Sequence, residues 1–256
     1  SGHSSDMKKI YRLKKKYNFK IIEDSCHALG GKYNKYKIGS CKYSDISTFS
    51  FHPVKPITTG EGGIITTNNK NIYEKLLLYR THGIHKNYRK FKNLSLGFDN
   101  NKEVNRWYYE MSDLGYNYRI TDIQAALGNS QLKRIDKITK KRNLVANFYK
   151  KEFRKISGIK IPICQKHIYH AYHLFTILID FEKLKMSRNS FMKKLANKGI
   201  GSQVLYIPVF MQPYYQKKYK FRFNDFTNSI SYYEKALSIP IFFDITKKEL
   251  KFVSKS

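Results

Sequence analysis

Hydrophobic and polar positions along this chain alternate between helical and extended patterns. Residues 6–17 place apolar side chains on one side and lysines on the other, which predicts an amphipathic helix. Residues 19–23 follow as a short apolar run that ends in carboxylates, which is typical of a strand. The same patterns predict helices at 69–79, 121–154, 188–198 and 228–238, strands at 46–51, 63–67, 172–179 and 204–207, and a small hairpin at 33–38.

This mixture of helices and strands indicates an α/β fold. The Gly-Ile-Lys-Ile-Pro segment at 158–162 marks a boundary, so we expect a large domain over residues 1–155 and a smaller α+β domain over 156–256. The helix that opens at Thr121 would connect the two domains. Residues 85–105 are polar and irregular, which predicts a long loop of the kind that is often functional.

The segment from Ser47 to Gly63 holds the main candidate for chemistry. It places Lys55 among hydroxyl side chains, between two predicted strands, and ends in Gly-Glu-Gly-Gly. A lysine in this setting could form a Schiff base, with the hydroxyls and backbone N–H groups holding a phosphate. The alternative is a solvent-facing lysine, since the chain has 49 lysines and arginines.

Asp24 favours the first interpretation of Lys55. It ends the predicted strand at 19–23 and precedes a turn of small residues. Open α/β sheets bind ligands at the carboxyl ends of their strands. An ionised aspartate there could keep the ring nitrogen of pyridoxal phosphate (PLP) protonated. Asp24 alone could equally be a turn or cap residue; together with Lys55 it indicates a PLP site.

Composition adds a competing hypothesis. The formal net charge of +30 could indicate a nucleic-acid partner, because lysine and arginine neutralise phosphates. The lysines are spread over the whole chain, however, and no RRM, zinc-finger or KH pattern is present. We therefore predict no nucleic-acid partner. The positive charge could still attract an anionic substrate such as a sugar diphosphate.

Other sequence features exclude further classes. The 3 cysteines show no C-x-x-C pattern, which is typical of free thiols in a reducing cytoplasm. No apolar run approaches the ~20 residues of a membrane helix, so no membrane partner is predicted. His167, His170 and His173 recur at a spacing that could suggest a metal. No cysteine or carboxylate completes that set, and the segment is predicted to enter a strand, so no metal is expected.

Four separate stretches carry a resemblance to a known family. The chain resembles the DegT/DnrJ/StrS-type sugar-nucleotide aminotransferases, which are PLP enzymes of fold type I. The resemblance covers essentially the whole chain. Within the family it is most similar to enzymes that aminate C-4 of UDP-linked 4-keto-6-deoxy-N-acetylhexosamines during pseudaminic acid synthesis. The matching stretches are 21–31 (IIEDSCHALGG), 49–63 (FSFHPVKPITTGEGG), 80–83 (RTHG) and 114–128 (LGYNYRITDIQAALG), and those at 202–209 and 212–215 carry the closer similarity.

The resemblance assigns roles to individual residues. Lys55 would be the catalytic Schiff-base lysine that also moves the proton, and Asp24 would pair with the pyridine nitrogen. His27 would lie beside the cofactor ring and its 3-oxygen. Ser50 would bind the cofactor phosphate. Asn117 would reach the partner's phosphate across a homodimer interface.

Arg119 would lie near the same shared site and bind substrate. For Asn117 and Arg119, an ordinary turn before a helix remains the alternative.

The implied reaction transfers an amino group from L-glutamate, through PLP, to a nucleotide-linked keto sugar in the cytoplasm. Relatives that dehydrate sugars carry histidine where Lys55 stands, so the lysine favours transamination. The implied fold is the C-terminal part of the large αβα domain together with the small domain. Family members also carry a long N-terminal segment, and we expect this chain to lack it. The alternatives are a non-catalytic relic of such an enzyme and a basic nucleic-acid-binding protein.

Overall fold

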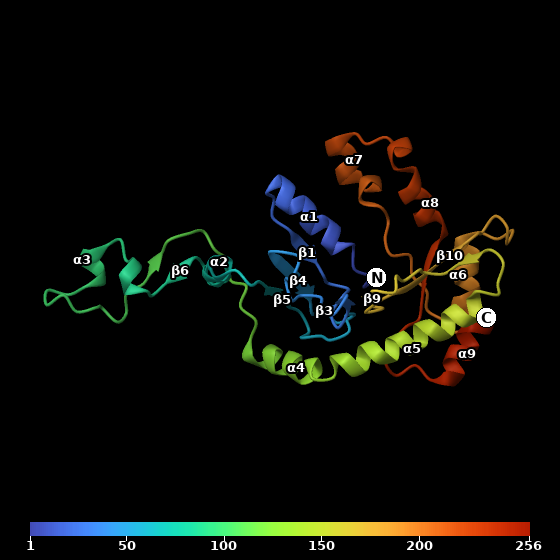
Figure 1. The fold of residues 1–256 in the computed structure, drawn as a ribbon, viewed down its shortest axis with the longest axis horizontal. Helices are drawn as coiled ribbons and strands as arrows, with labels where there is room; N and C mark the ends of the chain where they lie inside the picture. Colours follow the sequence, from blue (N-terminus) through green and yellow to red (C-terminus); the bar gives the residue numbers. More distant parts are fainter.

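The computed structural model describes residues 1–256 as two β-sheet cores joined by a long helix, with an arm that projects to one side (Figure 1). The N-terminal half begins with a helix, continues through five short strands and ends in the arm. Its elements are α1 (Met7–Tyr17), β1 (Ile22–Asp24), β2 (Lys32–Tyr33), β3 (Tyr36–Lys37), β4 (Ile46–Ser50), β5 (Gly63–Thr66), α2 (Lys70–Arg80), β6 (Ile84–His85), η1 (Tyr88–Lys90), α3 (Leu94–Gly97) and β7 (Glu110–Met111).

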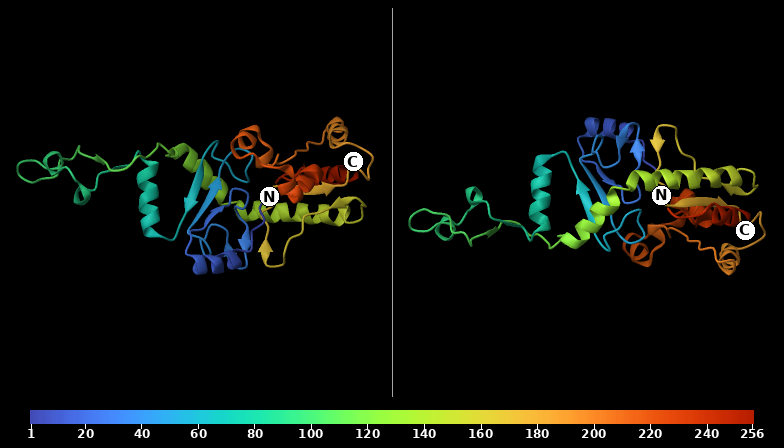
Figure 2. Two further views of the ribbon diagram at one scale, coloured as in Figure 1. Left: turned by 90° about the horizontal axis from the view of Figure 1, so that it is seen from above. Right: turned by 90° about the horizontal axis from the view of Figure 1, so that it is seen from below.

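The C-terminal half begins with two consecutive helices and continues into a second sheet that helices cover. Figure 2 shows α5 running alongside these C-terminal elements, with the arm at the opposite end of the molecule. The elements are α4 (Asp122–Leu132), α5 (Ile135–Phe153), β8 (Ile159–Lys160), β9 (Ile168–Tyr169), β10 (Phe175–Ile179), α6 (Arg188–Asn197), η2 (Val209–Met211), α7 (Pro213–Tyr219), η3 (Phe223–Phe226), α8 (Thr227–Lys235), β11 (Ala236–Ile239) and α9 (Lys247–Lys255).

The first sheet has the order β1-β4-β5 and combines a parallel pair with an antiparallel pair. β1 and β4 run parallel, with Asp24 opposite Thr48, so both chains leave the sheet at the same edge. The predicted strand at 19–23 is displaced, since β1 runs from Ile22 to Asp24. The Ile21 carbonyl instead accepts hydrogen bonds from the backbone N–H groups of Asp45 and Ile46 at the start of β4. The predicted hairpin is confirmed as β2 and β3.

The single helix predicted for 121–154 is wrong, because it is broken between Leu132 and Ile135. α4 contacts the loop between β4 and β5, because the Gln131 side chain is hydrogen-bonded to the backbone of Thr58 in that loop. α5 begins by burying Ile135 and Ile138 against apolar side chains of that loop and of β4. The break allows α4 to bond to the loop after β4 while α5 packs its apolar side chains against β4 and the same loop. No pattern of apolar residues signals it, since the spacing stays helical throughout.

The second sheet, of order β11-β10-β8, is antiparallel and forms the larger core. α5 supplies Val145, Ala146, Tyr149 and Phe153 to this core, and α6 and α9 add further apolar side chains. α5 therefore contributes to both cores, with its first turns in one and its later turns in the other. A domain boundary near residue 155 coincides with the end of α5 and stays a proposal.

The segment predicted as an irregular loop at 85–105 contains regular structure. It forms most of the arm, in which β6 pairs with β7 and the short elements η1 and α3 lie between them. Phe91 is buried there and contacts Tyr108 edge to face at 4.8 Å between ring centroids. The arm is therefore stabilised by a small aromatic core. It has no long apolar run of the kind from which secondary structure is usually predicted.

Two further predictions are wrong near the C-terminus. Residues 204–207 form no strand, because only Gln203 pairs with Ser238 before the chain leaves the sheet towards Pro208. The predicted helix at 228–238 ends at Lys235, and Ala236–Ile239 forms β11. All four residues of β11 are buried, so pairing with β10 outweighs the local helical pattern.

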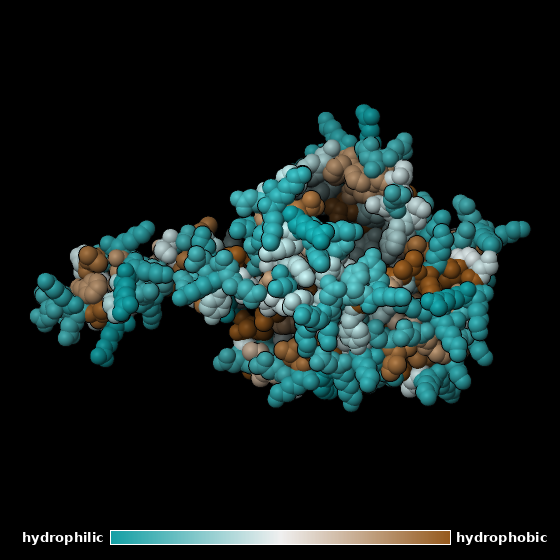
Figure 3. Space-filling model, in the orientation of Figure 1, coloured by the Kyte–Doolittle hydropathy of each residue, from teal (hydrophilic) through white to brown (hydrophobic).

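Surface properties add little to the functional assignment. Hydrophilic side chains spread over the whole visible face in Figure 3, without forming a single stripe. None of the helices is both long enough and apolar enough to cross a bilayer. Cys26, Cys41 and Cys164 are free thiols in the structure.

Candidate active site

Asp24 lies at the carboxyl end of β1, where the parallel neighbour β4 also ends. Its carboxylate is exposed, and Oδ1 accepts a hydrogen bond from the Cys26 backbone N–H at 3.1 Å. The pKa of Asp24 is lowered by hydrogen bonds from the side chain and backbone of Cys26, and further by the positive charge of Lys55. Asp24 is therefore an ionised carboxylate with free acceptor capacity at a strand end.

Lys55 lies in the loop between β4 and β5, and its side chain is half-buried. Its backbone N–H donates to the His52 carbonyl at 2.9 Å, and its ammonium makes no ion pair. The charge of Lys55 nevertheless lowers the pKa values of Asp24, His27 and His173. The Lys55 amine therefore affects the pKa values of Asp24 and His27 but forms no ion pair with Asp24.

Hydrogen bonds within the loop and to α4 fix the loop that carries Lys55. Ser50 ends β4, and its Oγ accepts a hydrogen bond from the His52 N–H at 3.3 Å. Thr58 Oγ1 donates to the Phe51 carbonyl at 2.9 Å, and Gln131 of α4 bonds both the N–H and the carbonyl of Thr58. These contacts close the loop on itself and on α4, so Lys55 and Ser50 are held by a defined backbone.

Glycine is required at one position of this loop. Gly62 has a φ of +141°, and a Cβ there would lie 2.6 Å from Thr59 Oγ1. Side chains other than glycine rarely adopt that backbone conformation. The Gly-Glu-Gly-Gly sequence therefore has a structural role, because Gly62 lets the chain turn into β5.

His27 lies in the turn after β1, on the same side as Asp24. Its ring contacts that of His173 at 4.3 Å between centroids, and its Nδ1 lies 3.2 Å from the Ser1 amino group. Burial, and after it the charge of Lys55, lower the pKa of His27 to about 4 against the opposing effect of Asp24. His27 is therefore neutral at physiological pH.

Asn117 and Arg119 lie in the segment that leads from the arm to α4. Both are exposed, and Asn117 forms an isolated antiparallel bridge with Thr81 at the base of the arm. Asn117 Oδ1 accepts from the Arg119 backbone N–H at 3.5 Å. No hydrogen bond or ion pair joins either residue to Lys55 or Asp24. The structure thus gathers Asp24, His27 and Lys55 around one strand edge and leaves Asn117 and Arg119 outside that group.

Sequence reasoning missed two buried residues next to this group. His173 was noticed only as part of a histidine spacing, and Arg142 gave no signal because it follows two lysines in a basic helix. Three histidines of that spacing have separate surroundings: the rings of His167, His170 and His173 contact Tyr33, Tyr172 and His27, respectively. No group of three or more histidine, cysteine, aspartate or glutamate side chains that could hold a metal is present.

The donor set fits PLP. Asp24 offers an ionised carboxylate for a cationic ring nitrogen, and Lys55 offers an amine that is free of any carboxylate partner. Ser50 and the hydroxyls of the loop that carries Lys55 can donate to a phosphate.

Comparison with known proteins decides the family. The model of the DegT/DnrJ/EryC1/StrS aminotransferase family matches residues 1–256. The chain belongs to this family. Its resemblance and its fold type I class, predicted from sequence motifs, are thereby confirmed, and enzymes of the family are PLP-dependent aminotransferases.

Individual relatives of the family cover nearly the whole chain. A UDP-4-amino-4,6-dideoxy-N-acetyl-beta-L-altrosamine transaminase of Campylobacter jejuni is 39% identical over 99% of this chain and 61% of its own length. The spore coat polysaccharide biosynthesis protein SpsC of Bacillus subtilis is 34% identical over 94% of this chain and 59% of its own length.

A solved structure agrees with these relatives. Helicobacter pylori PseC, an aminotransferase involved in the biosynthesis of pseudoaminic acid, superposes with a TM-score of 0.85 at 28% identity over 99% of this chain and 62% of its own. The chain spans about three fifths of the length of the curated relatives it matches. What those proteins act on is therefore a guide to this chain and not a property of it.

Proposed function

We propose that the protein takes part in transferring an amino group from L-glutamate to a 4-keto-6-deoxy nucleotide sugar, with PLP as cofactor. The observation that carries the proposal is the pairing of Asp24 and Lys55 around one strand edge, each free of a direct ionic partner. Support for the sugar comes from the relatives, of which several are transaminases of nucleotide-linked amino sugars. We place the product in cell-surface or flagellar glycan synthesis, including that of pseudaminic acid.

Each site residue has a role in this reaction. Bound PLP supplies an electron sink for the carbon that loses or gains the amino group. Lys55 holds the cofactor and moves the proton at that carbon, which requires an amine that becomes neutral during the reaction. Asp24 stays ionised and stabilises positive charge on the ring nitrogen. Ser50 donates a hydrogen bond to the phosphate, and the neutral His27 lies against the ring.

Asn117 and Arg119 need a second copy of the chain in this proposal. Both are exposed, and neither makes a hydrogen bond or ion pair with Lys55 of its own chain. A homodimer with shared sites would bring Asn117 to the partner's phosphate and Arg119 to the substrate. The exposed apolar side chains around them, Leu114, Tyr116 and Tyr118, are consistent with a surface that a second copy covers. We place this homodimer in the cytoplasm.

The test supplies PLP, L-glutamate and a UDP-linked 4-keto-6-deoxy-N-acetylhexosamine to the purified protein. We expect 2-oxoglutarate and a UDP-amino sugar, detected by mass spectrometry. Lys55→Ala should abolish both products, and Lys42→Ala, which changes an exposed lysine before β4, should leave them unchanged. Equal product from the wild type and Lys55→Ala would contradict the proposal. Cofactor binding without any product would favour the non-catalytic relic.

A further inference from the structure

His173 is buried beside the candidate site without an evident structural task. It lies between β9 and β10 and is 6% exposed, and its ring contacts the His27 ring at 4.3 Å between centroids, tilted by 52°. Neither ring nitrogen makes a hydrogen bond, and Nδ1 is buried without a partner. Such a nitrogen is unfavourable in a core. The contribution of this side chain is therefore its ring contact with His27.

Arg142 fixes the backbone that carries His173. Its Nη1 donates to the carbonyl oxygens of Tyr172 at 2.9 Å, His173 at 3.2 Å and Ile241 at 3.0 Å. Arg142 is 7% exposed and lies in the middle of α5. One buried guanidinium thus joins the His173 segment to α5 and to the chain that follows β11. These bonds fix the backbone from which the His173 ring extends to His27.

Burial keeps both rings neutral. It is the main cause that lowers the pKa of His173 to about 3, and the positive charges of Lys55 and Arg142 act in the same direction. Lys55 also lowers the pKa of His27, and Asp24 acts the other way. Two neutral imidazoles can stay in contact without repulsion.

We propose that His173 is a positioning residue: its ring holds the His27 imidazole in one orientation beside Lys55, and Arg142 anchors that contact to α5. The C-terminal half of the chain thereby sets part of a site whose other groups all come from the N-terminal half. The consequence for cofactor binding rests on the proposed function, because it assumes that His27 faces PLP. The ring contact itself does not depend on that function.

The first test measures the titration of His27 by NMR in cofactor-free protein. The wild type is expected to titrate with a pKa of about 4. His173→Ala removes the covering ring, so the pKa of His27 should rise towards its ordinary value of 6.5. His173→Phe keeps a planar ring and should keep that pKa low. His167→Ala is the matched control, since His167 contacts Tyr33 and not His27.

Folding is controlled with a further variant. If His173→Ala fails to fold, His173→Leu fills the volume without a planar ring, and the chemical shifts of the His27 ring protons report the loss of the ring contact. An unchanged His27 pKa in His173→Ala, or unchanged His27 ring shifts in His173→Leu, would overturn the proposal, as would an equal change in His167→Ala.

The second test measures PLP affinity by absorbance titration. His173→Ala should weaken binding about tenfold, which corresponds to about 1.4 kcal/mol, while His173→Phe and His167→Ala bind like the wild type. The KM for the nucleotide sugar should stay unchanged, because His173 is not expected to contact substrate. A wild type that binds no PLP would refute the proposed function, and the His27 titration would still decide the positioning role. Unchanged PLP affinity in His173→Ala would refute the cofactor part alone.

Discussion

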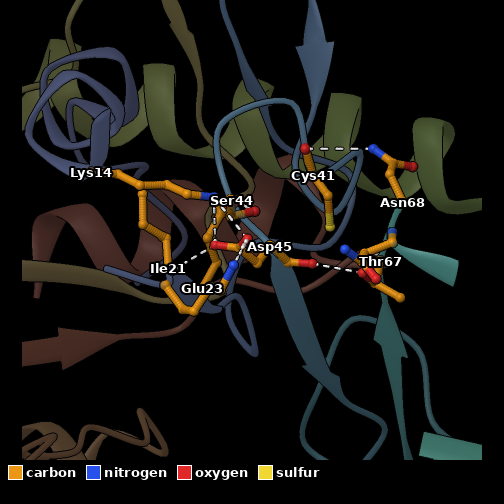
Figure 4. A network of polar contacts seen from close by, with 10 residues as sticks. Lys14, Ile21, Glu23, Cys41, Ser44, Asp45, Thr67 and Asn68 are labelled. Carbon is orange, nitrogen blue, oxygen red and sulfur yellow. Dashed lines mark hydrogen bonds and ion pairs between the residues drawn. The ribbon is translucent and has the colours of Figure 1, made fainter. Parts of the chain in front are cut away.

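Two pairs of lysine and aspartate lie near opposite ends of β1, and they differ in burial and in direct contact. Asp45, just before β4, accepts hydrogen bonds from Lys14 Nζ at 2.7 Å through both oxygens and from the Ile21 N–H at 2.8 Å (Figure 4). Its side chain is only 11% exposed. Asp24, at the other end of β1, is exposed, and Lys55 acts on it without contact. Lys14 and Asp45 form a direct ion pair, whereas Lys55 and Asp24 do not and can each bind a ligand.

The difference separates what holds the fold from what serves a ligand. Asp45 joins α1, the start of β1 and β4, and its backbone carbonyl also accepts from Thr67 Oγ1 at 2.7 Å. Such saturation is expected of a carboxylate that must stay buried. Asp24 has only the turn after β1 as a partner. An ionised group that the fold does not use, at the strand edge where α/β sheets bind ligands, is the signature of a site.

The largest expected effect is on the function of the second pair. Asp24→Asn keeps the size of the side chain and removes the charge that pairs with the ring nitrogen. Amino transfer should fall by about a hundredfold or more, the order found when one preorganised electrostatic partner is lost. Thermal stability should change by less than about 0.5 kcal/mol, as for other exposed positions. Steady-state kinetics and thermal unfolding check both parts; a large loss of stability with unchanged kcat would contradict them.

The reverse pattern is expected for the first pair. Asp45→Asn leaves Lys14 facing a neutral amide in a partly buried position, which should cost about 2–4 kcal/mol of unfolding free energy. Cofactor binding by the folded fraction should be unaffected. Urea unfolding and PLP titration of the same preparations measure the two quantities. If Asp45→Asn impaired PLP binding as strongly as Asp24→Asn, the division between fold and site would be wrong.

As the pH falls, the buried histidines should destabilise the protein at a higher pH than the protonation of Asp45 does. Burial lowers the pKa values of His170 and His173 to about 3, from an ordinary 6.5. Their contribution to stability is therefore complete above pH 6.5 and is lost as the pH falls towards the folded values. The loss amounts to about 1.4 kcal/mol per pH unit for each histidine. Urea unfolding at pH 7, 6 and 5 measures it, and His173→Phe should show a shallower slope.

Asp45 should respond only at lower pH. Burial works to raise the pKa of Asp45, but the Ile21 N–H and Lys14 outweigh it and hold that pKa below the ordinary 3.8. Its stabilisation is present above pH 3.8 and is lost as the pH falls through the folded value. Stability that stays flat between pH 7 and 5 would show that the histidines are not buried in the neutral form.

Much of the site could be predicted because its signals are local. Asp24 ends a strand, Lys55 lies in a glycine-rich loop between strands, and both properties can be seen in adjacent residues. The same holds for the helix caps: Thr121 and Gln124 form a capping box where the sequence predicts a helix start. Local chemistry of this kind does not depend on the rest of the fold.

What could not be predicted depends on contacts between distant segments. The break at Leu132 follows from separate partners of α4 and α5, and β11 forms because β10 offers it an edge. Arg142 and His173 were missed for the same reason. A buried arginine that binds three carbonyls looks, in the sequence, like one more basic residue on a helix.

The most direct test of the central claim asks which lysine holds the cofactor. The protein is incubated with PLP, treated with borohydride to fix the cofactor on its lysine, digested and mapped by mass spectrometry. The account predicts a single modified peptide that contains Lys55, with Lys14 unmodified because its amine is engaged by Asp45. Modification spread over many surface lysines, or none on Lys55, would contradict it.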